Sequence, residues 1–149
     1  MKKLLFFITV FTASLYACNN AGKVESENDV DAARNFIKAA LNGDYDKAAT
    51  YMIKDSANEE WMRQVKRVPI SPENKKGLAE ASIIIRKRIE LNDTATIVIY
   101  ANSFKNNDDT LRVIKKGEQW LVDFDYLFTH DRDSLWKTAP VIINDSVLK

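Results

Sequence analysis

The sequence predicts an α+β fold in which N-terminal helices pack on an antiparallel sheet of four or more strands. Up to about residue 80, apolar residues recur at steps of three and four, which is the period of an amphipathic helix. From Ala81 onward they alternate with polar residues, which is the period of a strand. Short connections between the alternating segments favour antiparallel pairing. One face of the sheet is too mixed for burial, so we expect the helices to cover the other face.

Residues 1–17 have the layout of a secretory leader. Lys2 and Lys3 form its positive start, and the apolar or small stretch that follows is too short for a bilayer span, which takes about 20 residues. Residues 15–18, which end in Cys18, resemble a bacterial lipoprotein box. That resemblance implies cleavage before Cys18 and acylation of its thiol, with palmitate-type chains anchoring the protein in a membrane. The alternatives are an ordinary cleaved signal peptide and an uncleaved anchor, with Cys18 incidental.

A lipoprotein leader predicts a lipid-anchored protein of the bacterial cell envelope. We expect the outer membrane, facing the periplasm, because Asn19 is not the aspartate associated with retention at the inner membrane. The sequence leaves the inner membrane and the cell surface open as alternatives. Cys18 is the only cysteine, which argues against a disulfide and against a CxxC site.

The 149-residue chain carries 22 Lys and Arg against 21 Asp and Glu. Loss of the leader removes Lys2 and Lys3 and changes the formal charge from +1 to −1. This balance gives no reason to expect a nucleic-acid partner. The remaining 132 residues are enough for one domain with a core. We divide them into a polar tether at 18–28, a domain at 29–126 and a C-terminal extension at 127–149. In the extension, Val141, Ile142 and Ile143 form either an edge strand or a docked tail.

Four helical segments precede the strands, and polar or small residues mark their ends. The N-terminal caps that we expect are, in chain order, Asp29, Asp44, Ser56 and Ser71. Gly43 ends the first segment, Pro69 ends the third, and the fourth is a short turn before Gly77.

Four alternating segments form the predicted sheet, at about 83–91, 95–104, 111–113 and 120–126. In the second segment, Ala95, Ile97 and Ile99 alternate with a more polar set that includes Thr96 and Tyr100. We expect the fourth segment to stay extended as far as Tyr126.

Three pieces of the chain resemble the nuclear transport factor 2-like superfamily (cystatin-like, SnoaL-like), and in particular its small bacterial lipoproteins of unassigned function. The pieces are residues 36–48, 94–98 and 116–123, within a region that runs from 29 to 126. The resemblance implies an α+β cone, in which a strongly curved sheet wraps around the N-terminal helices. Each piece is a structural signature, so the resemblance bears on fold more than on function.

Some enzymes of that superfamily hold an Asp, a Tyr or a His inside the cone. The candidates here are Asp123 and Asp125, which strand alternation places on one face, and His130, the single histidine. The plainer interpretation makes all three ordinary solvated residues. His130 with Asp131 and Asp133 lacks a fourth ligand and a known metal spacing, so we expect neither a metal nor a cofactor.

Tyr45, Trp61 and Tyr100 either line an apolar pocket or belong to the core. The sequence therefore predicts a non-catalytic domain that binds a small ligand or an envelope protein. Two alternatives stay open. One is a cone-pocket enzyme of the isomerase, dehydratase or hydrolase type, and the other is a structural subunit of an envelope complex.

Overall fold

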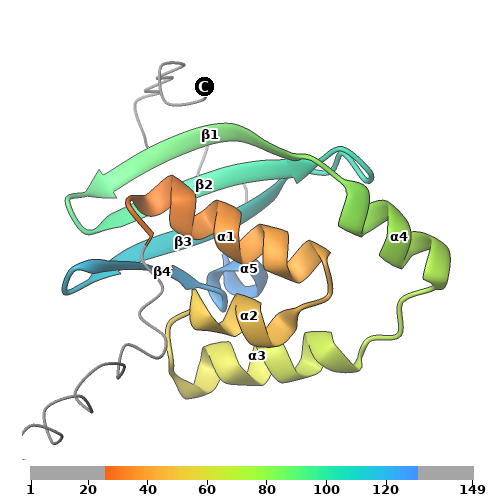
Figure 1. Ribbon diagram of the computed structural model, residues 1–149. Helices are drawn as coiled ribbons and strands as arrows, with labels where there is room; N and C mark the ends of the chain where they lie inside the picture. Colours follow the sequence, from red (N-terminus) through yellow and green to blue (C-terminus); the bar gives the residue numbers. More distant parts are fainter. Residues whose placement is uncertain (1–25, 131–149) are drawn as a thin grey trace, which may run out of the picture.

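A computed structural model describes residues 26–130, so that the leader, Cys18 and Val141 to Ile143 lie outside the described residues. In chain order, the elements are α1 (Asp29–Leu41), α2 (Tyr45–Thr50), α3 (Ser56–Arg67), α4 (Pro72–Glu80), β1 (Ile83–Asn92), β2 (Ala95–Asn102), β3 (Asp109–Lys116), β4 (Gln119–Asp123) and α5 (Tyr126–Thr129) (Figure 1). The predicted α+β class, with N-terminal helices packed on a four-stranded antiparallel sheet, is confirmed.

Side-chain caps begin all four N-terminal helices, as the sequence predicts. Asp44 and Ser71 are the caps of α2 and α4, and each accepts a hydrogen bond from the backbone of the third helical residue. In α1 and α3 the cap is the residue before the predicted one, because Asn28 and Asp55 accept the capping hydrogen bonds. The fourth helix is also longer than predicted and continues through Gly77.

Asp29 joins α1 to the sheet instead of capping the helix. Its carboxylate is buried. Arg88 of β1 donates to its Oδ2 from Nε at 2.8 Å, and Nη2 of the same guanidinium lies 2.8 Å from that oxygen in an ion pair. A buried carboxylate needs such a partner, because its desolvation would otherwise be costly. The pair therefore sets how the start of α1 lies against β1.

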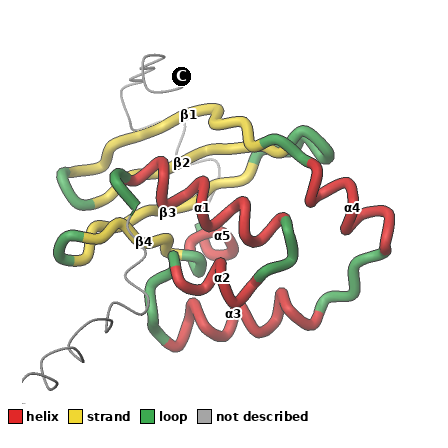
Figure 2. Tube along the Cα trace, in the orientation of Figure 1, coloured by secondary structure: helices red, strands yellow, loops and turns green. Residues whose placement is uncertain are grey.

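The strands pair in the order β1-β2-β3-β4, and α1 contacts all four of them from one side (Figures 1 and 2). The sheet is not strongly curled, in contrast to the strongly curved sheet that the family resemblance implies. Strong bending of a sheet usually needs bulges. Here the β2–β3 and β3–β4 ladders run without a register shift, and the two shifts both fall in the β1–β2 ladder.

One of those shifts changes which side chains of β1 face the helices. It lies between Ile85 and Lys87. Ile83 and Ile85 pack against the core under the helices, whereas Ile89 lies on the opposite face of the sheet. A single inserted residue has this effect because side chains alternate along a strand.

The strand β2 is buried on both faces, which corrects the expectation of a one-sided sheet. Val98 and Tyr100 belong to the core under the helices. Ile97 and Ile99 form a second cluster with Ile89 on the face turned away from α1, which we call the outer face. The strand thus reads as a nearly continuous apolar run, as central strands covered on both sides do.

The main core fills the space between the helices and the sheet. Its bulky members include Phe36, Ile37, Met52, Met62, Tyr100 and Phe124. The rings of Phe36 and Phe124 lie 5.1 Å apart, so α1 packs directly on the end of β4. Side chains therefore occupy the region in which the family resemblance implies a cone interior.

The close approach of Gly77 in α4 to Phe104 gives a prediction for stability. A Cβ added at Gly77 would overlap the Phe104 ring, so Gly77→Ala should lower the free energy of unfolding by about 1–3 kcal/mol. With Phe104→Ala already present, the same change should raise it by up to about 1 kcal/mol, because alanine favours a helix over glycine. Urea denaturation of the four proteins measures both effects. A stabilising Gly77→Ala in the parent chain would contradict this packing.

Candidate functional site

Asp123 lies on the outer face, where an ion pair engages it. Asp123 is 6% exposed, and its Oδ2 accepts hydrogen bonds from Nε of Arg112 at 2.8 Å and from Nη2 of the same residue. Arg112 and Asp123 are register partners on β3 and β4, beside Ile97 of β2. Two donors of one guanidinium thus meet the same carboxylate oxygen, and this ion pair ties β3 to β4.

Asp125 points away from Asp123, because β4 ends at Asp123 and the chain turns into α5. Its Oδ1 accepts from the indole Nε1 of Trp61 at 2.8 Å, and Thr129 donates to its other oxygen. The prediction that the two aspartates share a strand face is therefore wrong. Strand alternation applies only where the strand continues.

The turn after β4 depends on Asn58 of α3, which the sequence analysis did not single out. Asn58 is 1% exposed. Its Oδ1 accepts from the backbone N–H groups of Phe124 at 2.5 Å and Asp125 at 2.9 Å, and its Nδ2 donates to Asp55. The backbone N–H of Asn58 and then its side-chain amide donate to Asp55, and these hydrogen bonds hold the pKa of that carboxyl below its usual value. No sequence signal marks this residue, because its partners are 66 and 67 positions away.

His130 folds back on the first turn of α5. Its ring stacks on Tyr126 with 4.8 Å between centroids, and its Nδ1 lies 2.6 Å from the backbone oxygen of Tyr126. A carbonyl only accepts, so Nδ1 carries the proton. Nε2 is buried without a partner among the described residues. His130 approaches neither aspartate in a hydrogen bond, and no cluster of three metal-ligating residues occurs within 26–130.

All three aromatic residues proposed for a pocket lie in the main core or pack against it. Tyr100 lies in the main core, and burial raises the pKa of its hydroxyl. Trp61 packs against the same core and stacks on Phe128 at 4.0 Å. Tyr45 packs against this core as well and also lines a pocket.

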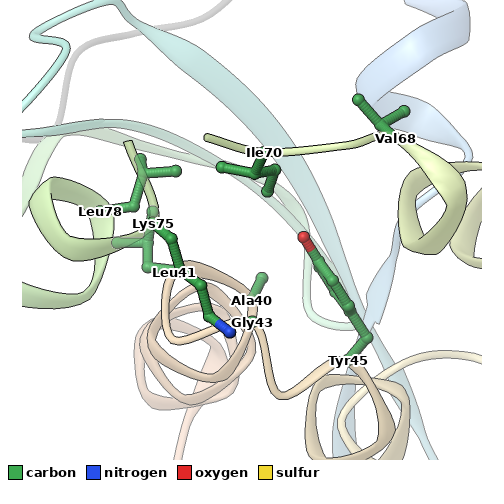
Figure 3. Close-up of a pocket in the computed structure, with 8 residues that line it drawn as sticks. All are labelled: Ala40, Leu41, Gly43, Tyr45, Val68, Ile70, Lys75 and Leu78. Atoms are coloured by element: carbon green, nitrogen blue, oxygen red, sulfur yellow. The ribbon is translucent and has the colours of Figure 1, made fainter. Parts of the chain in front are cut away.

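That pocket has a volume of about 200 Å³ and lies between the end of α1, the start of α2 and the connection from α3 to α4 (Figure 3). Its apolar walls are Ala40, Leu41, Val68, Ile70 and Leu78. Figure 3 shows the hydroxyl of Tyr45 directed toward Val68 and Ile70, and the amine of Lys75 extended toward Gly43. The site is thus apolar with one hydroxyl and one ammonium group.

Two breaks in the helices, at Gly43 and at Pro69, create the pocket. Gly43 has φ of +75°, a conformation that favours glycine, and this sharp turn starts α2 directly after α1. On the opposite wall, Val68 precedes Pro69 and is extended, as residues before proline usually are. Val68 and Ile70 are therefore excluded from both helices and stay at the surface, 61% and 40% exposed. The prolines at 69 and 72, which flank Ile70, were visible in the sequence, but the exposure of the two side chains was not.

Charge at the pocket comes from Lys75. Its side chain passes Gly43 closely, with Cε 3.9 Å from the place that a Cβ on Gly43 would take. It forms no ion pair with another residue of 26–130, whereas Lys66 nearby in sequence is paired with Asp46 at 2.5 Å. The hydrogen bond from Lys66 lowers the pKa of Asp46. An acidic group is the natural complement of the ammonium of Lys75.

Comparison with known proteins gives no relative for this chain: no family model, curated protein or solved structure matches it. Within the described part of the chain, every helix is too short or too polar to cross a membrane.

The role of Asn58 gives a second prediction for stability. Asn58→Ala should lower the free energy of unfolding by about 2–4 kcal/mol, because it leaves the buried backbone N–H of Phe124 and the partly buried N–H of Asp125 without their acceptor. Asn74→Ala on the exposed face of α4 is the matched control and should change it by less than about 0.5 kcal/mol. Chemical denaturation measures the difference. Equal effects of the two substitutions would show that Asn58 does not hold the turn after β4.

Proposed function

We propose that this chain is a lipid-anchored protein of the bacterial cell envelope whose folded domain is non-catalytic and binds a partner protein. The anchor rests on the leader and on Cys18, at the end of a polar tether. The binding role rests on one observation: two large apolar side chains, Val68 and Ile70, stand exposed beside an apolar pocket. Contiguous exposed apolar surface of this kind is typical of interaction sites.

A protein partner fits the pocket better than a free small molecule. Pockets for drug-sized ligands usually measure about 300–1,000 Å³, and this one measures about 200 Å³. A small ligand inside it would contact Val68 and Ile70 only where they line the pocket and would leave the rest of their exposed surface in water. A partner that inserts one apolar side chain would cover both residues, as anchor residues do at protein interfaces. Lys75 favours a partner with a carboxylate beside that anchor.

The enzyme alternative has less support. The ionisable side chains that line the pocket are Tyr45 and Lys75, whereas Asp123, Asp125 and His130 lie elsewhere and are engaged by other groups. General acid–base chemistry needs such groups together in a site that a substrate can enter.

Membership of the nuclear transport factor 2-like superfamily is part of the same proposal. The order of four N-terminal helices followed by an antiparallel meander supports it. The flatter sheet and the filled interior suggest a member that lacks the ligand cavity of the cone.

Charge reversal at the pocket tests the binding role. The probe is a capped peptide with one leucine between two glutamates. In NMR spectra of the 15N-labelled domain, it should shift the amide signals of residues 40–45 and 68–78. Lys75→Glu should weaken its binding about two- to fivefold and favour the matching lysine peptide, because one surface charge contributes about 1 kcal/mol or less.

Lys76→Glu is the matched control, since it changes the same charge at the next position of α4 outside the pocket. Ile70→Ser should abolish the shifts. Shifts that centre on other elements, or that Lys75→Glu and Lys76→Glu alter equally, would refute this pocket as the binding site.

Labelling of cells with an alkyne analogue of palmitate tests the anchor. The parent protein should carry the label and sediment with membranes. Cys18→Ala should lose the label, whereas Asn19→Ala should keep it, because acylation requires a thiol at the first mature position. Label that persists in Cys18→Ala would disprove the anchor and leave the pocket unaffected.

A further inference from the structure

Three isoleucines on the outer face of the sheet are buried, although the helices α1 to α4 lie on the other side. Ile89, Ile97 and Ile99 are 2%, 0% and 2% exposed. They are neighbours across the β1–β2 ladder, where Ile89 pairs with Ile97. A sheet with helices on one face normally leaves its second face in water. Burial of three isoleucines there requires a cover.

The end of the described chain supplies part of that cover. Tyr126 packs against the isoleucine cluster, and the guanidinium of Arg112 lies 4.7 Å from the centre of its ring. Burial raises the pKa of the Tyr126 hydroxyl. However, α5 has only four residues, and Phe128 in it turns toward Trp61 and Phe124. One tyrosine at one corner does not account for three buried isoleucines.

The chain leaves the described region at the same corner. His130 stacks on Tyr126, and its Nε2 is buried without a partner among residues 26–130. Nineteen residues follow His130. Extended, they reach about 60 Å, whereas four strands span only about 15–20 Å. Val141, Ile142 and Ile143 are the apolar run within that length.

We propose that residues 131–149 cross the outer face and seat Val141, Ile142 and Ile143 on the cluster of Ile89, Ile97 and Ile99. Both groups are β-branched and apolar, so the contact buries surface of the same chemistry on each side. The Arg112–Asp123 pair beside the cluster argues against a lipid surface as the cover, because it would place charges against acyl chains. The proposal is independent of the pocket between α1 and α4.

Photo-crosslinking in the full chain tests the contact directly. Benzoylphenylalanine replaces Ile142, and crosslinked peptides are identified after trypsin digestion. The peptide 89–105 contains all three isoleucines, since no Lys or Arg lies between Arg88 and Lys105. We expect an intramolecular crosslink to that peptide. The same probe at Val68, on the exposed rim of the pocket, is the control and should not reach it.

Three results would overturn the proposal. They are a crosslink that joins two copies of the chain, a crosslink that forms only with lipid in vesicles of phosphatidylethanolamine and phosphatidylglycerol, and a crosslink to the pocket residues. Each would assign a different cover to the outer face or a different place to the tail.

Thermal unfolding gives an independent test. Ile142→Asp should lower the midpoint by about 5–10 °C, because it places a carboxylate against buried isoleucines. Val147→Asp makes the same kind of change in the same segment outside the seated run, and should lower it by less than about 2 °C. An unchanged midpoint for Ile142→Asp, or equal shifts for the two variants, would contradict the proposed contact between Ile142 and the isoleucine cluster.

Discussion

The fold depends most on one buried amide. Asn58 lies in the first turn of α3, yet it accepts the backbone hydrogen bonds of Phe124 and Asp125 at the end of β4. Buried backbone groups beyond the end of a strand need partners. Asn58 supplies them from a distant element and also donates to the α3 cap, Asp55. It therefore joins the helical layer to the sheet and decides where the sheet ends.

The position of that turn separates groups that would otherwise lie together. Asp123 stays on the outer face with Arg112, while Asp125 turns toward Trp61. Tyr126 then reaches the outer face, and Phe128 packs on the helical side. What looks in the sequence like an acid–base face is in fact a junction that ties three elements together. These residues make structural contacts within the described part of the chain.

The molecule offers two surfaces on opposite sides of the sheet. The pocket between α1 and α4 exists because Gly43 and Pro69 break the helices next to it, and it leaves apolar side chains in water. The outer face is apolar as well, but its isoleucines are already covered. The difference in exposure separates a surface available to a partner from one that belongs to the interior. The proposed binding surface therefore lies on the helical side of the sheet.

Local patterns in the sequence determined the element order, two of the four helix caps and the antiparallel meander, because period, capping and turn chemistry act within a few residues. Three features depended on the tertiary structure: the bulge before Lys87, the burial of β2 on both faces, and the end of β4 at Asp123. Each is set by contacts between distant segments. An alternating pattern predicts a strand, but only its neighbours in space decide which face is covered and where the strand must turn.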